Sequence, residues 1–184
     1  MIFLTRRERF NAAHRLFRPE WSEEKNAEVY GKCSNPNWHG HNYELFVTVK
    51  GIVNSDIGYL ADLKQLSNLI REHVTDKLDH KNLNLDVDFM DGRITSAENI
   101  AIAIWEQIEM PIHKLGIELH CVKLYETENN FVEYFEKNVG EMREVKKKMH
   151  NPKYEIRSPL PLAFWQVKYQ DVLPHPNEYD FQVE

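Results

Sequence analysis

The pattern of apolar and polar positions along the chain predicts four strands and two helices. Residues 39–53 alternate with a period of two, and apolar residues after Asp62 recur at helical spacing. A second helical pattern follows Thr95-Ser96-Ala97-Glu98, where a hydroxyl precedes a glutamate by three residues, as in a capping box. The predicted elements are strands over 2–10 and 39–53, helices from Asp62 to near Leu78 and from Thr95 to Pro111, and strands over 117–126 and 130–135.

Strands and helices are grouped in this order and do not alternate. Grouping favours an α+β fold with an antiparallel sheet, because alternating strands and helices are typical of parallel sheets. Two stretches, 15–38 and 79–94, lack a clear period, and we interpret both as loops.

Residues 136–184 differ in character from the rest of the chain. They contain five prolines interleaved with aromatic residues, and 141–150 could form a short charged helix. Disordered tails are usually poor in aromatic residues. The sequence therefore predicts a first domain over 1–135 and a C-terminal extension over 136–184 that packs on the core or on a neighbouring subunit.

Composition excludes several classes of protein. The 184 residues carry a net charge of −6, which argues against binding of nucleic acid by a basic surface. No run approaches the roughly 20 apolar residues of a membrane helix. The first residues become charged too early for a secretory signal peptide, and two cysteines give no disulfide-like spacing. We therefore expect a cytoplasmic protein.

His39 and His41 begin the alternating stretch, so their side chains share one face of the predicted strand. His14 follows the first strand, which is expected to pair with the strand that contains these two histidines. Three neutral imidazoles would leave one position of a tetrahedral zinc ion open, as in catalytic sites. The alternative is that they are unrelated histidines, since the chain has nine.

Cys33 lies six residues before His39 and directly after Lys32. A neighbouring ammonium group favours the thiolate, which is the nucleophilic and basic form of cysteine. The alternative is a small buried apolar residue, which describes Cys121 better because that cysteine lies within a predicted strand.

Two further patterns carry acidic groups. Asp79 and His80 are adjacent at a helix end, where they could shuttle a proton or simply form a helix-terminating turn. Glu126 ends the third predicted strand. A carboxylate can accept two parallel N–H donors from a flat ligand such as a pterin or guanine, although an exposed turn glutamate is the simpler interpretation.

These motifs together resemble the 6-pyruvoyltetrahydropterin synthase family. The resemblance covers about residues 1–135 and follows the order of motifs in the family. The matching segments are Phe10-Asn11-Ala12-Ala13-His14, Gly31-Lys32-Cys33 through His39-Gly40-His41-Asn42-Tyr43, Leu78-Asp79-His80-Lys81-Asn82-Leu83, Thr95-Ser96-Ala97-Glu98-Asn99 and Tyr125-Glu126-Thr127-Glu128-Asn129-Asn130.

The resemblance implies the tunnelling fold, a four-stranded antiparallel sheet with two helices between its strand pairs. In the family, three sheets join in a barrel, two trimers form a homohexamer, and active sites lie between subunits. The resemblance also implies a zinc-dependent lyase that removes triphosphate from 7,8-dihydroneopterin triphosphate. The implied roles are zinc binding by His14, His39 and His41, general base catalysis by Cys33 with proton transfer by Asp79 and His80, and pterin binding by Glu126 with Thr95 and Ser96.

Two alternatives remain open at this point. Related 6-carboxytetrahydropterin synthases release acetaldehyde in queuosine-precursor synthesis, and bacterial enzymes of that type usually carry three residues between the cysteine and His-Gly-His. Here five residues, 34–38, separate them, which resembles the pyruvoyl enzymes. The second alternative is a non-catalytic pterin-binding module whose structural zinc is held by Cys33 and the three histidines.

Overall fold

A five-stranded sheet forms one layer of the molecule, in a computed structural model that describes residues 1–135. The strand order is β3-β1-β2-β4-β5. β1 and β2 are the longest strands, and they pair antiparallel over thirteen residues each. The strands are β1 (Ile2–His14), β2 (His39–Gly51), β3 (Lys81–Asn82), β4 (Glu118–Tyr125) and β5 (Phe131–Tyr134).

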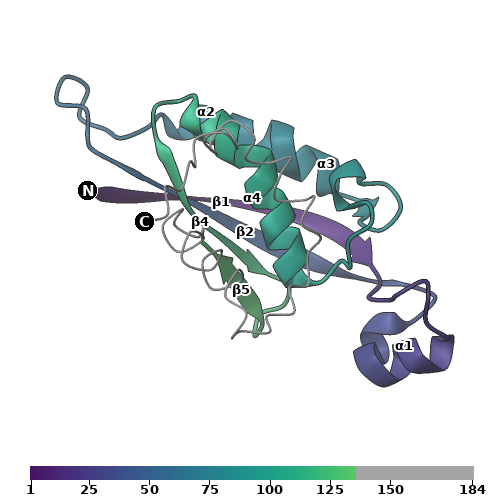
Figure 1. Cartoon of the computed structure of the whole chain (residues 1–184). Helices are drawn as coiled ribbons and strands as arrows, with labels where there is room; N and C mark the ends of the chain where they lie inside the picture. Colours follow the sequence, from purple (N-terminus) through teal and green to yellow (C-terminus); the bar gives the residue numbers. More distant parts are fainter. Residues whose placement is uncertain (136–184) are drawn as a thin grey trace, which may run out of the picture. The chain divides into compact units, whose positions relative to one another are not determined.

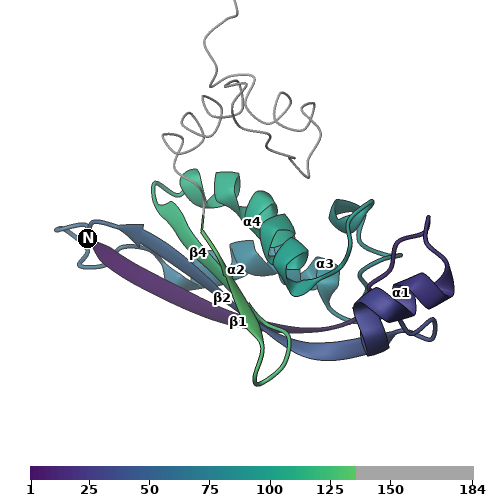
Figure 2. The same ribbon diagram turned by 60° about the horizontal axis from the view of Figure 1, so that its bottom comes forward.

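The helices α2, α3 and α4 cover one face of this sheet, whereas α1 lies beyond the end of β1 and β2 (Figures 1 and 2). The faces that meet are apolar. Tyr43, Leu45 and Val47 alternate along β2 and are fully buried against Ile104 and Ile108 of α4 and the rest of the core. The helices are α1 (Glu23–Tyr30), α2 (Leu63–Ile70), α3 (Asp76–Leu78) and α4 (Ala97–His113).

The α+β class predicted from the sequence is confirmed, but the prediction of a purely antiparallel four-stranded sheet is wrong. A fifth strand, β3, pairs parallel with Ala12 and Ala13 of β1, which makes the sheet mixed, and the sheet is open. β3 has only two residues, both polar. A strand this short has no alternation that a sequence pattern could reveal.

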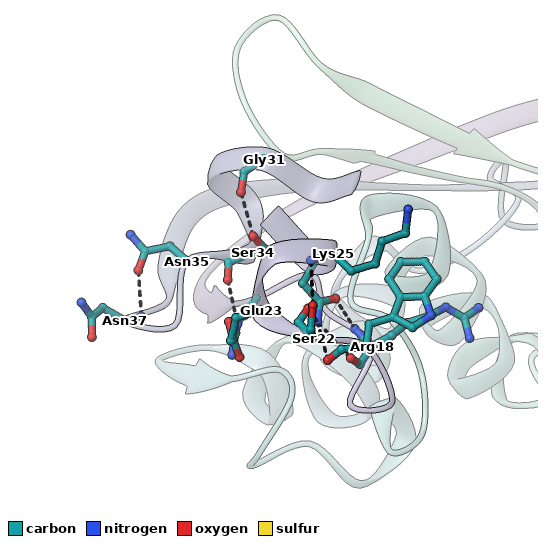
Figure 3. A network of polar contacts seen from close by, with 11 residues as sticks. Arg18, Ser22, Glu23, Lys25, Gly31, Ser34, Asn35 and Asn37 are labelled. Carbon is teal, nitrogen blue, oxygen red and sulfur yellow. Dashed lines mark hydrogen bonds and ion pairs between the residues drawn. The ribbon is translucent and has the colours of Figure 1, made fainter. Parts of the chain in front are cut away.

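The interpretation of residues 15–38 as an irregular loop is also wrong. Ser22 caps α1 by accepting a hydrogen bond from the Lys25 N–H, and a short 3₁₀ helix, Gly31–Ser34, follows directly (Figure 3). Only Asn26 of α1 is buried. A helix with so little apolar surface has no hydrophobic period, although Ser22 followed by two glutamates is a helix-start signal.

The two predicted core helices are confirmed with changes at their ends. The first is α2, continued by a π-helical turn, Arg71–Thr75, and by α3 to Leu78. The second is capped by Ser96, not by Thr95, and it runs past Pro111 to His113. Pro111 removes only its own N–H, and the Lys114 N–H still bonds to the Met110 carbonyl, so the last turn persists.

The predictions for residues 136–184, namely a separate extension with a charged helix and packing on the core or a neighbour, lie outside the described residues. Within residues 1–135, no helix is long and apolar enough to cross a lipid bilayer.

Candidate metal centre and adjoining pocket

Three histidines lie together where β1 ends and β2 begins. The antiparallel register places His14 opposite His39, and His41 follows on the same face of β2. The His14 ring centroid is 4.4 Å from that of His39 and 5.1 Å from that of His41. One ligand atom from each side chain lies within 4.8 Å of the other two. The cluster expected from strand pairing is therefore present.

Close strand approach helps to form this cluster. Gly40 lies between the two histidines of β2, and a Cβ atom there would be 3.0 Å from the Ala12 carbonyl oxygen. A side chain at this position would require the facing backbone to move by a few tenths of an ångström.

A backbone hydrogen bond orients the His14 ring. Its Nδ1 lies 2.7 Å from the Thr95 carbonyl oxygen, in the loop before α4. A carbonyl oxygen can only accept, so Nδ1 carries the proton and Nε2 presents a lone pair. His14 is fully buried, and its Nε2 has no hydrogen-bond partner in the described part of the chain.

The electrostatics of the cluster favour neutral imidazoles. The pKa of His14 is lowered to about 4, mainly by burial; the neighbouring His39 and His41 contribute to the decrease, whereas the bond to Thr95 opposes it. Burial also lowers the pKa of His39, with a smaller contribution from His41. Neutral imidazole is the form that binds metals, so these side chains are ready as ligands near pH 7.

The donor set fits a zinc ion. Besides His14 Nε2, the His39 Nδ1 atom is buried without a partner among residues 1–135. Buried polar atoms are rarely left unpaired, and a cation would satisfy lone pairs that no protein hydrogen bond satisfies. Nitrogen donors from three histidines, with an open fourth position, are the ligand set of catalytic zinc.

Cys33 reaches the same region from the 3₁₀ helix that follows α1. Its carbonyl accepts a hydrogen bond of 2.9 Å from the Leu16 N–H, just after β1. Next to it, the Arg15 Nε–H donates to the Ser34 carbonyl at 2.6 Å, and the Ser34 hydroxyl donates to the Gly31 carbonyl (Figure 3). These bonds fix the backbone of Cys33, whereas the residue is exposed.

A cavity of about 420 Å³ joins several of the predicted site residues. Cys33, Ser96 and Glu126 all line it, although they come from three separate parts of the chain. The sequence did not predict the other lining residues as site residues, although Glu98 and Asn129 lie within the motifs quoted above. These include Leu16, Glu98, Asn129 and Phe131.

Glu126 is held by the tight turn between β4 and β5. Its N–H donates to the Asn130 carbonyl, and the Thr127 hydroxyl accepts from the next N–H groups of the turn. The Glu126 carboxylate points back to the histidines, because its Oε1 lies 3.6 Å from His14 Nε2 and 3.9 Å from His41 Nε2. The same side chain therefore borders both the cavity and the histidine cluster.

Three other predicted site residues do not line this cavity. The Thr95 hydroxyl is buried against the Arg15 carbonyl and the Asn84 side chain, at 3.1 and 3.2 Å. Asp79 and His80 do not line the cavity. Asp79 accepts from the Asn11 N–H at 2.7 Å and lies 2.8 Å from His80 Nδ1. The bond from Asn11 is the main reason that the Asp79 pKa lies below its usual value.

His80 is exposed at the β3 edge of the sheet. Its side chain is 82% exposed, and its backbone adopts a left-handed conformation with φ of 59°. The turn-forming interpretation of this pair is thus consistent with the geometry.

Tyr43 is a neighbour of the histidine cluster that the sequence did not predict as a functional residue. It follows His41 on the same face of β2, stacks on Phe10 at 4.8 Å, and is fully buried. Its hydroxyl has no hydrogen-bond partner within the described residues. Burial raises its pKa, and the nearby Glu126 and Cys33 add to that effect. The alternation of β2 placed Tyr43 on this face, but it gave no sign of the unpaired hydroxyl.

The substitution Tyr43→Phe tests whether this hydroxyl is unpaired in the metal-free protein. A buried hydroxyl without a partner costs about 1–3 kcal/mol. We therefore expect the urea midpoint of unfolding to stay constant or to rise. The slope of the free energy of unfolding against urea concentration should not change. A loss of more than about 1 kcal/mol would mean that the hydroxyl is hydrogen-bonded, because lost hydrogen bonds typically cost that much.

The fold and the site together define an α+β protein with a cluster of three histidines that could hold a metal ion, beside a cavity lined by a thiol and a carboxylate. Residues 3–137 match the family model for 6-pyruvoyl tetrahydropterin synthase. A 6-pyruvoyl tetrahydrobiopterin synthase from Dictyostelium discoideum is 47% identical over 133 residues, which cover 72% of this chain and 95% of that protein.

A solved structure and a less similar sequence point to the same family. The structure of Caenorhabditis elegans 6-pyruvoyl tetrahydropterin synthase matches with a TM-score of 0.69 at 34% identity, covering 74% of this chain and 96% of that one. A 6-carboxy-5,6,7,8-tetrahydropterin synthase from Rickettsia typhi is 30% identical over 152 residues, covering 72% of this chain and 99% of that protein. This chain belongs to the 6-pyruvoyl tetrahydropterin synthase family.

Proposed function

We propose that this chain is a zinc-dependent 6-pyruvoyltetrahydropterin synthase. Its substrate would be 7,8-dihydroneopterin triphosphate, from which it eliminates triphosphate. The observation that carries the proposal is the position of Glu126, which lines one cavity with Cys33 and also approaches the histidine cluster, in a chain of this family. A thiol base, a carboxylate and a metal centre are the groups that such an elimination requires.

The three histidines would hold the zinc ion. When bound, zinc supplies Lewis-acid chemistry, because it polarises substrate oxygens and so acidifies the adjacent C–H bonds. Cys33, exposed in the cavity, removes the proton as general base. The bonds from Leu16 and Arg15 to the surrounding backbone keep Cys33 in place during this step. Glu126 binds the pterin ring by accepting its paired N–H donors, and Ser96 lines the same cavity.

Asp79 and His80 return a proton in this proposal, although they do not line the cavity of their own chain. Their position at the exposed β3 edge is compatible with an active site completed by a neighbouring subunit. The open sheet has edges that three copies could join in the tunnelling-fold barrel. We therefore propose a homohexamer of two stacked trimers, in the cytoplasm, with active sites between subunits.

Product analysis tests the proposed reaction. With 7,8-dihydroneopterin triphosphate under reducing conditions, the zinc-loaded protein is expected to release triphosphate and to form 6-pyruvoyltetrahydropterin. Mass spectrometry of the products checks both. A protein that binds the pterin without releasing triphosphate would be a binding module, and the enzyme proposal would be wrong.

Acetaldehyde with 6-carboxytetrahydropterin would instead identify the carboxy enzyme. The Rickettsia relative is the observation that keeps this second candidate open. The pyruvoyl reaction is favoured because the Dictyostelium relative is 47% identical, against 30% for the Rickettsia protein. The five-residue spacing between Cys33 and His39 agrees with it. No observation favours the module with a closed zinc site, since Cys33 lies outside the group of mutually close ligand atoms.

A further inference from the structure

Helix α1 contributes little to the apolar core, yet its position is fixed by polar contacts. Asn26, its one buried residue, accepts a hydrogen bond of 2.8 Å from the Arg18 N–H and donates one of 3.0 Å to the Arg18 carbonyl. The Ser22 hydroxyl caps the first turn (Figure 3). Helices are usually held by an apolar face that packs on the core, and α1 lacks such a face. It is therefore a fixed support that stands outside the core.

Glu23, the first residue of α1, is the partner of a buried arginine. Its carboxylate accepts a hydrogen bond from one Nη of Arg15, a residue that is only 8% exposed. The Arg15 Nε–H donates to the Ser34 carbonyl, and the guanidinium carbon lies 4.7 Å from the centre of the Phe17 ring. Because the guanidinium group is planar, holding one of its donors fixes the direction of the others. Glu23 thus orients the donor that reaches Ser34.

The 3₁₀ helix that carries Cys33, Gly31–Ser34, depends on contacts of this kind. It has four residues, and 3₁₀ helices have poorer hydrogen-bond geometry than α-helices. Two hydrogen bonds hold it to the segment after β1, one from the Leu16 N–H to the Cys33 carbonyl and one from Arg15 to the Ser34 carbonyl. The second of these bonds is the one that involves a side chain. Arg15 is therefore the point at which a substitution can loosen the backbone of Cys33.

The backbone of Arg15 is itself held by two side chains. Asn84 accepts a hydrogen bond from the Arg15 N–H and donates one to the Arg15 carbonyl, both at 3.0 Å. The Thr95 hydroxyl donates to the same carbonyl at 3.1 Å. With the backbone fixed, the direction of the guanidinium group depends on its side-chain partners, Glu23 among them. A change on α1 is thereby transmitted to the backbone of the candidate base.

We propose that Glu23 is a positioning residue for Cys33 and that it acts through Arg15. The inference rests on the proposed function, because the position of the thiol matters for turnover only if Cys33 is the base. A general base must lie within about 3 Å of the proton that it removes, so a small displacement of the thiol slows the reaction. Neither Glu23 nor Arg15 lines the cavity, so the effect falls on kcat and not on substrate binding.

The test compares Glu23→Ala and Arg15→Lys with the wild-type protein, all full-length and loaded with zinc. Glu23 is exposed, so its truncation should leave the fold intact. Lysine retains the positive charge of Arg15, but it cannot donate to two partners in the fixed geometry of a guanidinium group. We expect kcat to fall at least about tenfold for Arg15→Lys and at least about threefold for Glu23→Ala, because a misplacement of about 1 Å can cost about 100-fold. The KM and the zinc content should not change.

Hydrogen exchange supplies a readout that needs no turnover. Deuterium uptake in residues 31–38 should be faster in both variants, because the 3₁₀ helix loosens when the bond to the Ser34 carbonyl weakens. The matched controls are Glu24→Ala, in the same turn of α1, and Arg18→Lys, at an exposed arginine that pairs with Glu20. Both controls should keep the wild-type kcat and the wild-type uptake in this segment.

The outcomes separate this inference from the proposed function. If the wild-type protein releases triphosphate but either variant keeps its kcat, these contacts do not position the base and only this inference is wrong. A fall in kcat without faster exchange in residues 31–38 would contradict it as well, since the effect would then not pass through the backbone of Cys33. Loss of zinc or a higher KM would indicate a general structural effect and would also overturn it. If the wild-type protein releases no triphosphate, the proposed function and this inference both fail.

Discussion

Replacement of Cys33 by alanine is expected to lower kcat by about 100- to 10,000-fold, which is the usual contribution of a positioned general base. The zinc content should stay at about one ion per subunit, because three histidines bind the metal without the thiol. Steady-state assays with metal analysis of the same samples check both results. The side chain is exposed and its backbone is held by bonds that do not involve the sulfur, so the fold should persist.

Cys121→Ala is the matched control for this experiment. Cys121 is the other cysteine, it is buried in β4, and burial raises the pKa of its thiol to about 11. Such a thiol is protonated near neutral pH and acts as a small apolar residue. Its loss should therefore leave kcat nearly unchanged. If Cys33→Ala instead loses its zinc, then Cys33 is a ligand and its assignment as the base is wrong.

Much of the histidine cluster could be predicted because it depends on local rules. Alternation along residues 39–53 places His39, His41 and Tyr43 on one face, and Tyr43 is indeed buried there. Pairing of the first two strands then brings His14 beside His39. Both steps need only strand periodicity and an antiparallel neighbour. The structure agrees with them, whereas the catalytic roles of the residues stay predictions.

The approach of Glu126 to this cluster could not be predicted from the sequence. It depends on the register between β2 and β4, in which Glu44 lies opposite Tyr125 and therefore brings the following Glu126 toward Tyr43. That register contains an irregularity between Thr48 and Val49. A single bulge shifts the pairing by one residue, and an apolar pattern does not mark its position.

The backbone groups that hydrogen-bond to the site residues could not be predicted from the sequence either. The Thr95 carbonyl sets the tautomer of His14 although the two residues are 81 positions apart. Every residue has a carbonyl, so its role depends on the tertiary fold and not on residue type. The same applies to the Cys33 carbonyl, which accepts from Leu16 and so fixes the candidate base. Sequence motifs identified the groups with chemistry, whereas tertiary contacts determined their orientation.

His39→Ala is expected to weaken zinc binding by more than about 100-fold, since even the loss of a group that merely supports a ligand costs 10- to 100-fold. Two imidazoles then remain, and turnover should fall with the metal. His39 is partly exposed at the start of β2, so its truncation should not unfold the chain. By contrast, truncation of the buried His14 would also remove its hydrogen bond to Thr95.

His113→Ala provides the matched control, because His113 is an exposed histidine at the end of α4, outside the cluster. Chelator competition should give this variant the zinc affinity of the wild-type protein. The contrast between the two variants assigns the metal to the cluster, since nonspecific binding to surface histidines would weaken equally in both. If His39→Ala kept the wild-type affinity, the ion would have to be bound elsewhere, and the proposed roles of Cys33 and Glu126 beside it would lose their basis.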